Sequence, residues 1–174
     1  MIQLIGHKAI IAIEYVVTHP ESLMGHGRLW FDGQPLGSLE DLIYLDGYLL
    51  GCLQDLNKKP RLTDRYWGTD KHRLFHALYD DLCSYDEEDS KDFSEAAWPY
   101  NLTCGTLFDC YSVFAYRQDD EQGRILWRLE GDGENVFDDL KHASRDVHIA
   151  DFSYERLNVL ASELENALRD VSTA

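Results

Sequence analysis

Basic residues and long apolar runs are both scarce in this sequence of 174 residues. It holds 16 Lys and Arg against 32 Asp and Glu, which gives a formal net charge of −16 at pH 7. Nucleic-acid binding requires cations that displace the counterions of the phosphates, and anionic membranes also attract cations. We therefore expect neither a nucleic-acid partner nor a membrane partner. A strongly basic partner, by contrast, would be attracted from a distance.

Signals for membrane insertion, secretion and disulfide bonding are also missing. No stretch reaches the roughly 18 consecutive apolar residues of a membrane span, and Met1–Lys8 lacks the basic-then-apolar order of a secretory signal. The chain has four cysteines, Cys52, Cys83, Cys104 and Cys110, and no two of them have the Cys-x-x-Cys spacing. This spacing favours small core residues in a reducing compartment over a disulfide or zinc framework. The predicted location is the cytoplasm.

The composition is that of an ordinary globular protein, with 44% hydrophobic and 28% charged residues. Because no repeat or linker interrupts the chain, we expect one domain over residues 1–174. Alternating apolar residues predict strands over 9–18, 28–32, 107–116, 124–130 and 147–152. Helical spacing predicts helices over 38–57, 70–83, 134–142 and from Ser153 onward. This order predicts an α+β fold, with a mostly antiparallel sheet and helices packed on it.

Local motifs suggest where several of these elements begin and end. Asp32-Gly33 is a common tight-turn pair that follows a strand. Ser38 and Asp41 have the spacing of a capping box, so the first helix is expected to begin at Ser38. Asp70 is the expected N-cap of the second helix. Apolar residues on both faces of segment 107–116 predict a central strand.

Catalytic and metal-binding patterns are weak. His72, His76 and Asp80 share one helix face, but the sequence lacks the Glu that a metalloprotease places between its histidine ligands. No nucleophile elbow, glycine-rich phosphate loop or Cys/His signature is present. We therefore expect no enzyme, no catalytic residue, no metal and no cofactor. A small cytoplasmic enzyme with His72 or His76 in its pocket stays open as an alternative.

Acidic residues gather in two segments. The first runs from Asp80 to Glu95 with Lys91 as its sole cation, and the second begins at the turn 119–121. The helix that leads into the first segment has Lys71 and Arg73 in its first turn, against the helix macrodipole. This arrangement indicates a surface that serves an external partner, although a merely solubilising surface stays possible.

Candidate binding residues follow from these two segments. Five aromatic side chains near the first segment could anchor an interface, as Trp and Tyr often do. They are Tyr79, Tyr85, Phe93, Trp98 and Tyr100, and a position in the core stays the alternative for each, above all for Trp98. The predicted partner-binding residues are Asp80, Asp81, Tyr85, Asp86, Glu87, Glu88, Asp89, Asp92, Asp119, Asp120 and Glu121.

The segment from Trp30 to Leu39, Trp-Phe-Asp-Gly-Gln-Pro-Leu-Gly-Ser-Leu, follows a strand that contains Ile-Glu-Tyr at 13–15. Together they resemble the opening of small bacterial immunity proteins, most closely the immunity protein 42 type. The strand 109–116, the turn with Gly123 and the return strand that begins Arg124-Ile-Leu fit the same layout. Such proteins are encoded beside polymorphic toxins and the toxins of contact-dependent growth inhibition.

The resemblance implies a binding protein without catalytic residues, whose partner is a cognate toxin domain. Many of these toxins are nucleases with basic surfaces, and an acidic protein could cover such a surface in place of nucleic acid. The leading hypothesis is a cytosolic immunity protein that occludes one toxin. An acidic regulatory module for a basic cellular partner is the other non-enzymatic alternative, and the oligomeric state is left open.

Overall fold

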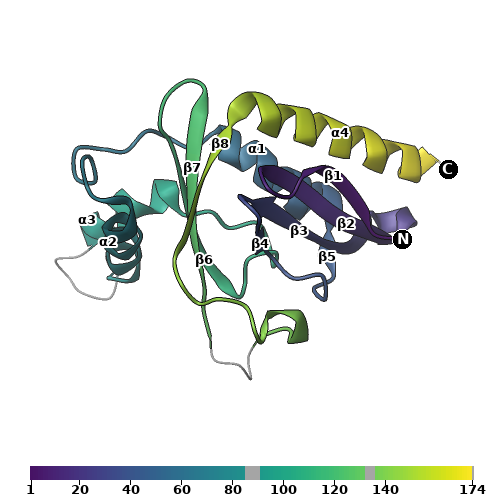
Figure 1. Ribbon diagram of the computed structural model, residues 1–174, viewed down its shortest axis with the longest axis horizontal. Helices are drawn as coiled ribbons and strands as arrows, with labels where there is room; N and C mark the ends of the chain where they lie inside the picture. Colours follow the sequence, from purple (N-terminus) through teal and green to yellow (C-terminus); the bar gives the residue numbers. More distant parts are fainter. Residues whose placement is uncertain (85–90, 132–135, 174) are drawn as a thin grey trace.

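The computed structural model describes residues 1–84, 91–131 and 136–173. Within them, the protein has an α+β fold with two antiparallel sheets and helices packed on both, as predicted (Figure 1). No helix in these ranges combines the length and the apolar character that a membrane crossing requires.

The first sheet has the strand order β1-β2-β3-β4, and β5 also pairs with β3. Its strands are β1 (Gln3–His7), β2 (Ile11–His19), β3 (Met24–Phe31), β4 (Gln34–Leu36) and β5 (Ile43–Tyr44). The strands predicted over 9–18 and 28–32 are confirmed as β2 and β3, although β3 begins earlier, at Met24. β1 was not predicted, because it is short and Gly6 interrupts its apolar pattern.

The turn at Asp32-Gly33 joins β3 to β4 as the sequence predicted. Phe31 pairs with Gln34, so the turn has two residues between the strands. Both residues have positive φ, 49° at Asp32 and 77° at Gly33. This is the type I′ geometry, whose twist matches that of the flanking strands and which favours the Asp-Gly pair.

The first helix does not begin at Ser38, so that prediction is wrong. Helical structure starts at Leu45 with a π-helical segment, η2 (Leu45–Leu50), and continues as α1 (Gly51–Asn57). The Ser38 hydroxyl instead donates a 2.6 Å hydrogen bond to the Asp139 carboxylate, and the Glu40 carboxylate accepts a 2.8 Å bond from the Asp138 N–H. The Ser38 side chain, which was expected to cap a local helix, therefore binds a segment about 100 residues away.

The second sheet has the order β6-β7-β8, formed by β6 (Tyr111–Arg117), β7 (Gln122–Leu129) and β8 (His148–Ser153). The central strand is therefore β7, and the prediction that segment 107–116 forms the central strand is wrong. The apolar residues on both faces of β6 have another cause. Val113 and Ala115 face one core cluster, while Phe114 and Tyr116 face a second, so the sheet is covered on both sides.

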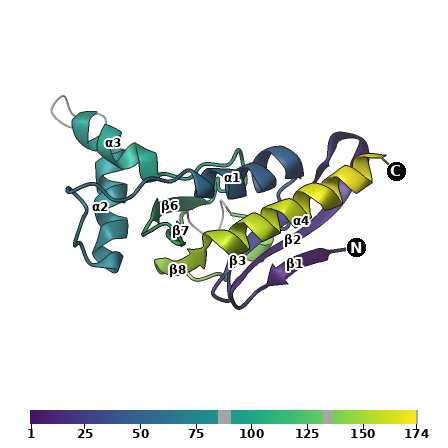
Figure 2. The same cartoon turned by 90° about the horizontal axis from the view of Figure 1, so that it is seen from above.

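Helices cover the sheets at two ends of the molecule (Figures 1 and 2). α1 and α4 (Tyr154–Thr173) lie side by side on one face of the first sheet, whereas α2 (Lys71–Cys83) and α3 (Lys91–Ala97) pack at the far end. Asp70 caps α2 as predicted, because its carboxylate accepts hydrogen bonds from the N–H groups of His72 and Arg73. Short 3-10 turns complete the fold: η1 (Pro20–Ser22), η3 (Trp98–Tyr100) and η4 (Asp138–Leu140). The helix predicted over 134–142 is only partly described, and among its described residues the 3-10 turn η4 is the helical part.

Two core clusters lie on opposite faces of the second sheet. In the first, Phe31 of β3 has its ring centroid 6.0 Å from that of Trp127 of β7 and 6.0 Å from that of Phe152 of β8. In the second, Phe75 of α2 meets Phe114 of β6 edge to face at 5.4 Å. The two sheets thus share a core, and the α2–α3 pair is attached to the outer face of the second sheet.

The cysteines only partly follow the prediction that all four are core residues. Cys52 and Cys104 are buried, Cys110 is partly buried and Cys83 is exposed at the end of α2. Burial and the neighbouring Cys104 raise the pKa of the Cys52 thiol. The prediction is therefore wrong for Cys83, which lies on the outward side of an amphipathic helix.

Candidate functional site

The first predicted acidic segment begins at the C-terminal end of α2. Asp80 is exposed, whereas Asp81 is half-buried and held within the fold. The Arg65 guanidinium donates two hydrogen bonds to the Asp81 carboxylate, at 2.7 and 2.9 Å, and the Tyr66 hydroxyl donates a third at 2.7 Å. Burial raises the pKa of Asp81, but these bonds lower it by more, so the group stays ionised. Asp81 therefore fixes the loop that precedes α2.

The rest of this segment is described only in part. Tyr85, Asp86, Glu87, Glu88 and Asp89 lie outside the described residues. The backbone of Asp92 belongs to α3, and its side chain lies outside the description.

The second predicted segment forms the tight turn between β6 and β7. The Asp119 carboxylate accepts hydrogen bonds from the N–H groups of Glu121 and Gln122, both at 2.8 Å, and these bonds lower its pKa. The Asp120 carboxylate accepts a 2.9 Å bond from Arg61, and the Glu121 side chain is exposed. Asp119 therefore shapes the turn, while Asp120 and Glu121 lie on its outside.

One loop connects the two acidic segments. It runs from the end of α1 to the start of α2, and its Arg61 binds Asp120 while its Arg65 binds Asp81. Arg61 also lies against the end of β6, in a parallel bridge with Arg117. The fold thus places Asp81 of the first segment and Asp120 of the second beside the loop 58–70.

Two exposed tryptophans lie in the same part of the molecule. Trp67, in this loop, is 71% exposed, and Trp98, in η3, is 62% exposed. Their neighbours Tyr66 and Tyr100 are buried, and the two tyrosine rings meet edge to face at 5.6 Å. Trp67 and Trp98 therefore project from chain segments that pack together. We call the exposed side chains of Trp67, Asp80, Trp98, Asp120 and Glu121 the acidic–aromatic surface.

A family model described as immunity protein 42 matches residues 1–167 of the chain. The chain belongs to the immunity protein 42 family. No curated protein and no solved structure matches it. Membership supports an immunity function and implies a cognate toxin as partner, and immunity proteins are generally not enzymes.

The aromatic residues of this immunity protein divide between core and surface. Trp98 is exposed, so it is available as an interface anchor. Tyr100 is 1% exposed, and the expectation that it anchors a partner is wrong. Tyr79 is half-buried, stacked on Phe75 at 6.2 Å. Trp67 was missed by sequence reasoning, because it lies in a polar segment without apolar periodicity. Tyr85 and the Phe93 side chain lie outside the described residues.

The histidine face of α2 offers this immunity protein no assembled site. His72 and His76 are exposed, and the His76 ring lies edge-on to Phe75 at 5.7 Å. Across residues 1–84, 91–131 and 136–173, no three His, Cys, Asp or Glu side chains gather in a way that could hold a metal ion.

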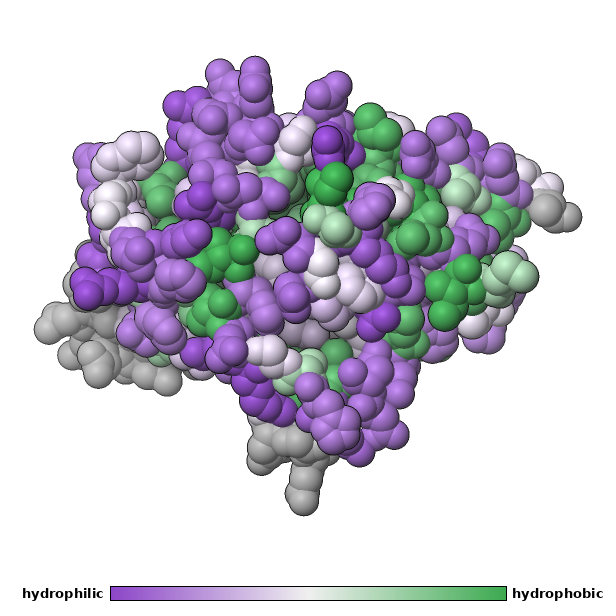
Figure 3. Space-filling model, viewed as in Figure 1, coloured by the Kyte–Doolittle hydropathy of each residue, from purple (hydrophilic) through white to green (hydrophobic). Residues whose placement is uncertain are grey.

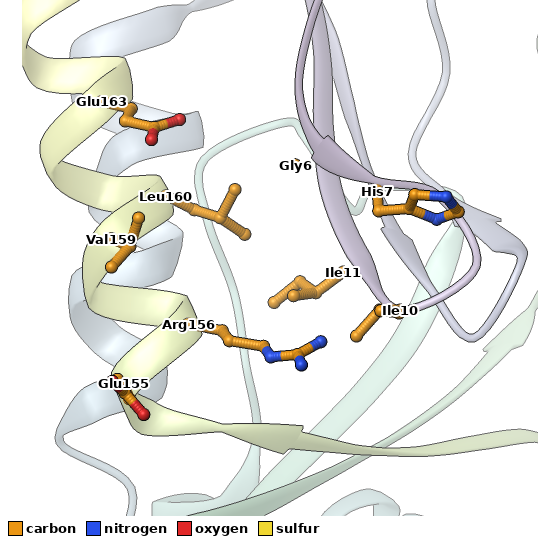
Figure 4. A pocket seen from close by; sticks show the side chains of 9 residues that line it. All are labelled: Gly6, His7, Ile10, Ile11, Glu155, Arg156, Val159, Leu160 and Glu163. Atoms are coloured by element: carbon orange, nitrogen blue, oxygen red, sulfur yellow. The ribbon is translucent and has the colours of Figure 1, made fainter.

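A groove lies on another side of this immunity protein, between the β1–β2 turn and α4 (Figure 4). It has a volume of about 480 Å³, with Ile10, Val159 and Leu160 among its lining residues. Figure 3 shows hydrophobic residues exposed over this part of the molecule, on a face that is otherwise mainly hydrophilic.

Proposed function

We propose that this immunity protein protects the cell from a basic nuclease toxin by binding it in the cytosol and covering its nucleic-acid-binding surface. The observation that carries the proposal is the net charge of −16 together with the acidic–aromatic surface. Carboxylates on a shaped surface can take the place of phosphates on a basic enzyme, and exposed tryptophans supply the apolar contacts that stabilise an interface.

The balance of charges within the fold supports this surface as the docking site. Asp81 and Asp119 are committed to internal hydrogen bonds, so they act by shaping the loop 58–70 and the β6–β7 turn. Asp80 and Glu121 are exposed, and the Arg61 ion pair of Asp120 is itself open to solvent. Exposed ion pairs contribute little, so a basic partner can replace Arg61 at small cost.

The net charge would help immunity by raising the rate at which the protein binds the toxin. In contact-dependent growth inhibition, the toxin arrives from a neighbouring cell and must be bound before it acts. Complementary charge raises association rates toward about 10⁸–10⁹ M⁻¹s⁻¹ at low salt, against about 10⁵–10⁶ M⁻¹s⁻¹ without steering. An acidic protein of one domain, present before the toxin enters, meets this requirement by stoichiometric binding.

The test uses the toxin domain encoded beside this gene and two variants with the same loss of charge. The first neutralises the three acids of the acidic–aromatic surface, as Asp80→Asn, Asp120→Asn and Glu121→Gln. The control neutralises three exposed acids at the opposite end of the molecule from α2, as Glu21→Gln, Asp46→Asn and Asp170→Asn. Association and dissociation rates are measured from about 50 to 500 mM salt, beside nuclease activity and inhibition.

We expect the surface variant to associate more slowly than the control and to lose more of its salt dependence. If this surface lies at the centre of the interface, dissociation also accelerates by about 30-fold or more, which corresponds to roughly 2 kcal/mol. Equal rates for the two variants would show that the acidic–aromatic surface is only solvated and that the toxin binds elsewhere. A toxin without nuclease activity would contradict the proposed toxin class.

A further inference from the structure

The two exposed tryptophans of this protein lie on chain segments that are held firmly by the fold. Tryptophan is highly buried on average, and it is enriched where proteins bind one another. Trp67 is 71% exposed in the loop 58–70, and Trp98 is 62% exposed in η3. The other two tryptophans, Trp30 and Trp127, are partly buried and buried. The contacts that hold the two exposed rings therefore decide how the acidic–aromatic surface meets a partner.

A tight turn fixes the backbone around Trp67. The N–H groups of Tyr66 and Trp67 both donate to the Thr63 carbonyl, at 3.0 Å each. The Thr69 N–H donates to the Tyr66 carbonyl at 3.2 Å. Gly68 has a φ of 76°, a conformation that residues with a Cβ rarely adopt. The backbone position of Trp67 is therefore set by the turn, although its side chain extends into solvent.

The residue before Trp67 is anchored in the second core cluster. Tyr66 is 1% exposed, and its ring meets that of Tyr100 edge to face at 5.6 Å. The Tyr66 hydroxyl donates a 2.7 Å hydrogen bond to the Asp81 carboxylate, which also accepts two bonds from Arg65. Burial, and then this hydrogen bond, raise the pKa of Tyr66, so its hydroxyl keeps the proton that it donates. One carboxylate of α2 thus holds two consecutive residues directly before Trp67.

Tyr100 joins the same loop to η3, the segment that contains Trp98. The Tyr100 hydroxyl accepts a 2.9 Å hydrogen bond from the Thr63 N–H and donates to the Arg61 carbonyl at 3.1 Å. The Lys59 ammonium donates to the carbonyl groups of the two residues that flank Tyr100. These contacts join the loop and η3 into one unit, so the two exposed indole rings project from backbone positions at a fixed separation.

We propose that Tyr66 and Asp81 are positioning residues for toxin binding, which hold Trp67 in the place, relative to Trp98, that the toxin recognises. Tyr66 is too buried to contact a partner. The Asp81 side chain is 16% exposed, and its carboxylate is occupied by Arg65 and Tyr66. Both residues therefore act through Trp67. The inference rests on the proposed function, because it takes the acidic–aromatic surface as the docking site, and it adds that buried residues set the affinity of that surface.

The physical basis of this role is pre-organisation. Binding orders the side chains and loops of an interface, and the free-energy cost of that ordering weakens the complex. A loop that is fixed before the toxin arrives avoids this cost. A loop released from Asp81 would place Trp67 in the recognised position for only part of the time, and the apparent affinity would fall by that fraction. The interior hydrogen bond of Tyr66 is therefore expected to affect binding as well as stability.

The first test removes one buried hydroxyl group. Tyr66→Phe keeps the ring that packs on Tyr100 and loses the hydrogen bond to Asp81. We expect the toxin domain to dissociate from this variant about fivefold faster or more. Tyr15→Phe is the matched control, because Tyr15 is also 1% exposed and its hydroxyl donates a 2.6 Å bond to Gln3 in the first sheet. The control should stay within about twofold of the wild type. Equal dissociation rates for the two variants would overturn the proposal.

The second test asks whether Tyr66 acts through Trp67. A double-mutant cycle measures how far the effects of two changes depart from additivity. Tyr66→Phe should accelerate dissociation by about fivefold in the wild type and by less than about twofold in the Trp67→Ala background. Asp81→Asn, which alters the acceptor instead of the donor, should show the same dependence on Trp67. An equal effect in both backgrounds would show a general structural role and overturn the proposal.

A third measurement follows Trp67 in the free protein. Nuclear magnetic relaxation of its backbone N–H gives an order parameter, which is about 0.85 for rigid backbone and below about 0.6 for flexible backbone. We expect a rigid value in the wild type and in Tyr15→Phe, and a lower value in Tyr66→Phe. Faster dissociation of Tyr66→Phe without a lower order parameter at Trp67 would overturn the positioning role.

Failure of this inference and failure of the proposed function give different results. If Trp67→Ala weakens toxin binding and Tyr66→Phe does not, the surface binds the toxin and only the positioning role is wrong. If Trp67→Ala and the neutralised surface variant both bind like the wild type, the docking site lies elsewhere and both proposals are wrong. Sedimentation of the wild type as a dimer that Trp67→Ala dissociates would assign the surface to a second copy and would also overturn both.

Discussion

Glu14 holds an ion-pair network on the outer face of the first sheet, and Glu14→Gln tests how much this network stabilises the fold. Its carboxylate accepts hydrogen bonds from Lys8 at 2.7 Å, Arg28 at 2.8 Å and the Trp30 indole at 2.9 Å. The Glu14 side chain is only 11% exposed. Lys8 also lies 4.2 Å and Arg28 4.9 Å from the centre of the Trp30 ring.

The expected cost follows from the state of these partners. A net hydrogen bond to a charged group is worth about 1.5–3 kcal/mol, and removing one member of a buried ion pair costs about 3–5 kcal/mol. The amide keeps one acceptor oxygen, and Lys8 remains partly solvated at 37% exposure. We therefore expect a loss of about 3 kcal/mol, or roughly 6–12 °C in melting temperature for a domain of this size.

Urea unfolding followed by circular dichroism measures this loss as a lower midpoint at an unchanged m-value. Glu165→Gln is the matched control, because Glu165 pairs with Arg169 at 3.4 Å while both side chains are more than half exposed. The control should cost no more than about 0.5 kcal/mol. Equal losses for the two variants would refute the claim that burial and multiple donors make the Glu14 network strong.

The same residue predicts a pH dependence. Burial raises the pKa of Glu14, but the hydrogen bonds from Lys8, Arg28 and Trp30 lower it by more, so the folded-state pKa is depressed. Its stabilisation is therefore present above the unfolded-state pKa of about 4.3 and is lost as the pH falls through the folded-state value. The stability gap between the wild type and Glu14→Gln should be full at pH 7 and shrink below about pH 4.

Two further predictions concern packing. A chain that ends at Glu163 loses Leu164 and Leu168, which are 0% and 2% exposed, and burial of each leucine is worth about 1.5–3 kcal/mol. This truncated chain should be insoluble or should unfold at a much lower urea midpoint. An unchanged midpoint would show that the second half of α4 does not stabilise the fold. Gly123→Ala would place a Cβ against the Phe152 ring, so the free energy of unfolding should fall by about 1–3 kcal/mol in the same assay. No change would show that the ring moves aside freely.

Elements with strong local signals were predictable, and those set by distant contacts were not. β2, β7, α2 and α4 have clear periodicity, and the positive φ angles at Asp32-Gly33 follow from residue type. Ser38 has the local look of a cap, but the Asp139 carboxylate accepts its hydroxyl, so a tertiary contact determines its conformation. β6 reads as central because both its faces are buried, although sheet position depends on hydrogen-bond partners that hydropathy does not report.

The candidate site shows the same division. The acidic residues were visible in the sequence, but the ion pairs of Asp81 with Arg65 and of Asp120 with Arg61 join residues 16 and 59 positions apart. Trp67 has no periodic neighbours that would mark it as exposed. The groove between the β1–β2 turn and α4 requires that turn to lie beside a helix some 140 residues later, which no local pattern reveals. Resemblance to a family therefore indicated the function, while the fold was needed to locate surfaces.

The carboxylates and the tryptophans of the acidic–aromatic surface would serve different steps of toxin capture. Exposed carboxylates act through long-range attraction, so the acidic–aromatic surface would govern how often the toxin arrives in a productive orientation. The exposed Trp67 and Trp98 act at contact range, so they would govern how long the toxin stays. A basic toxin could share the first property with many unrelated basic proteins. Recognition of one cognate partner would therefore depend on the contacts of the two tryptophans, which need a surface of matching shape on the toxin.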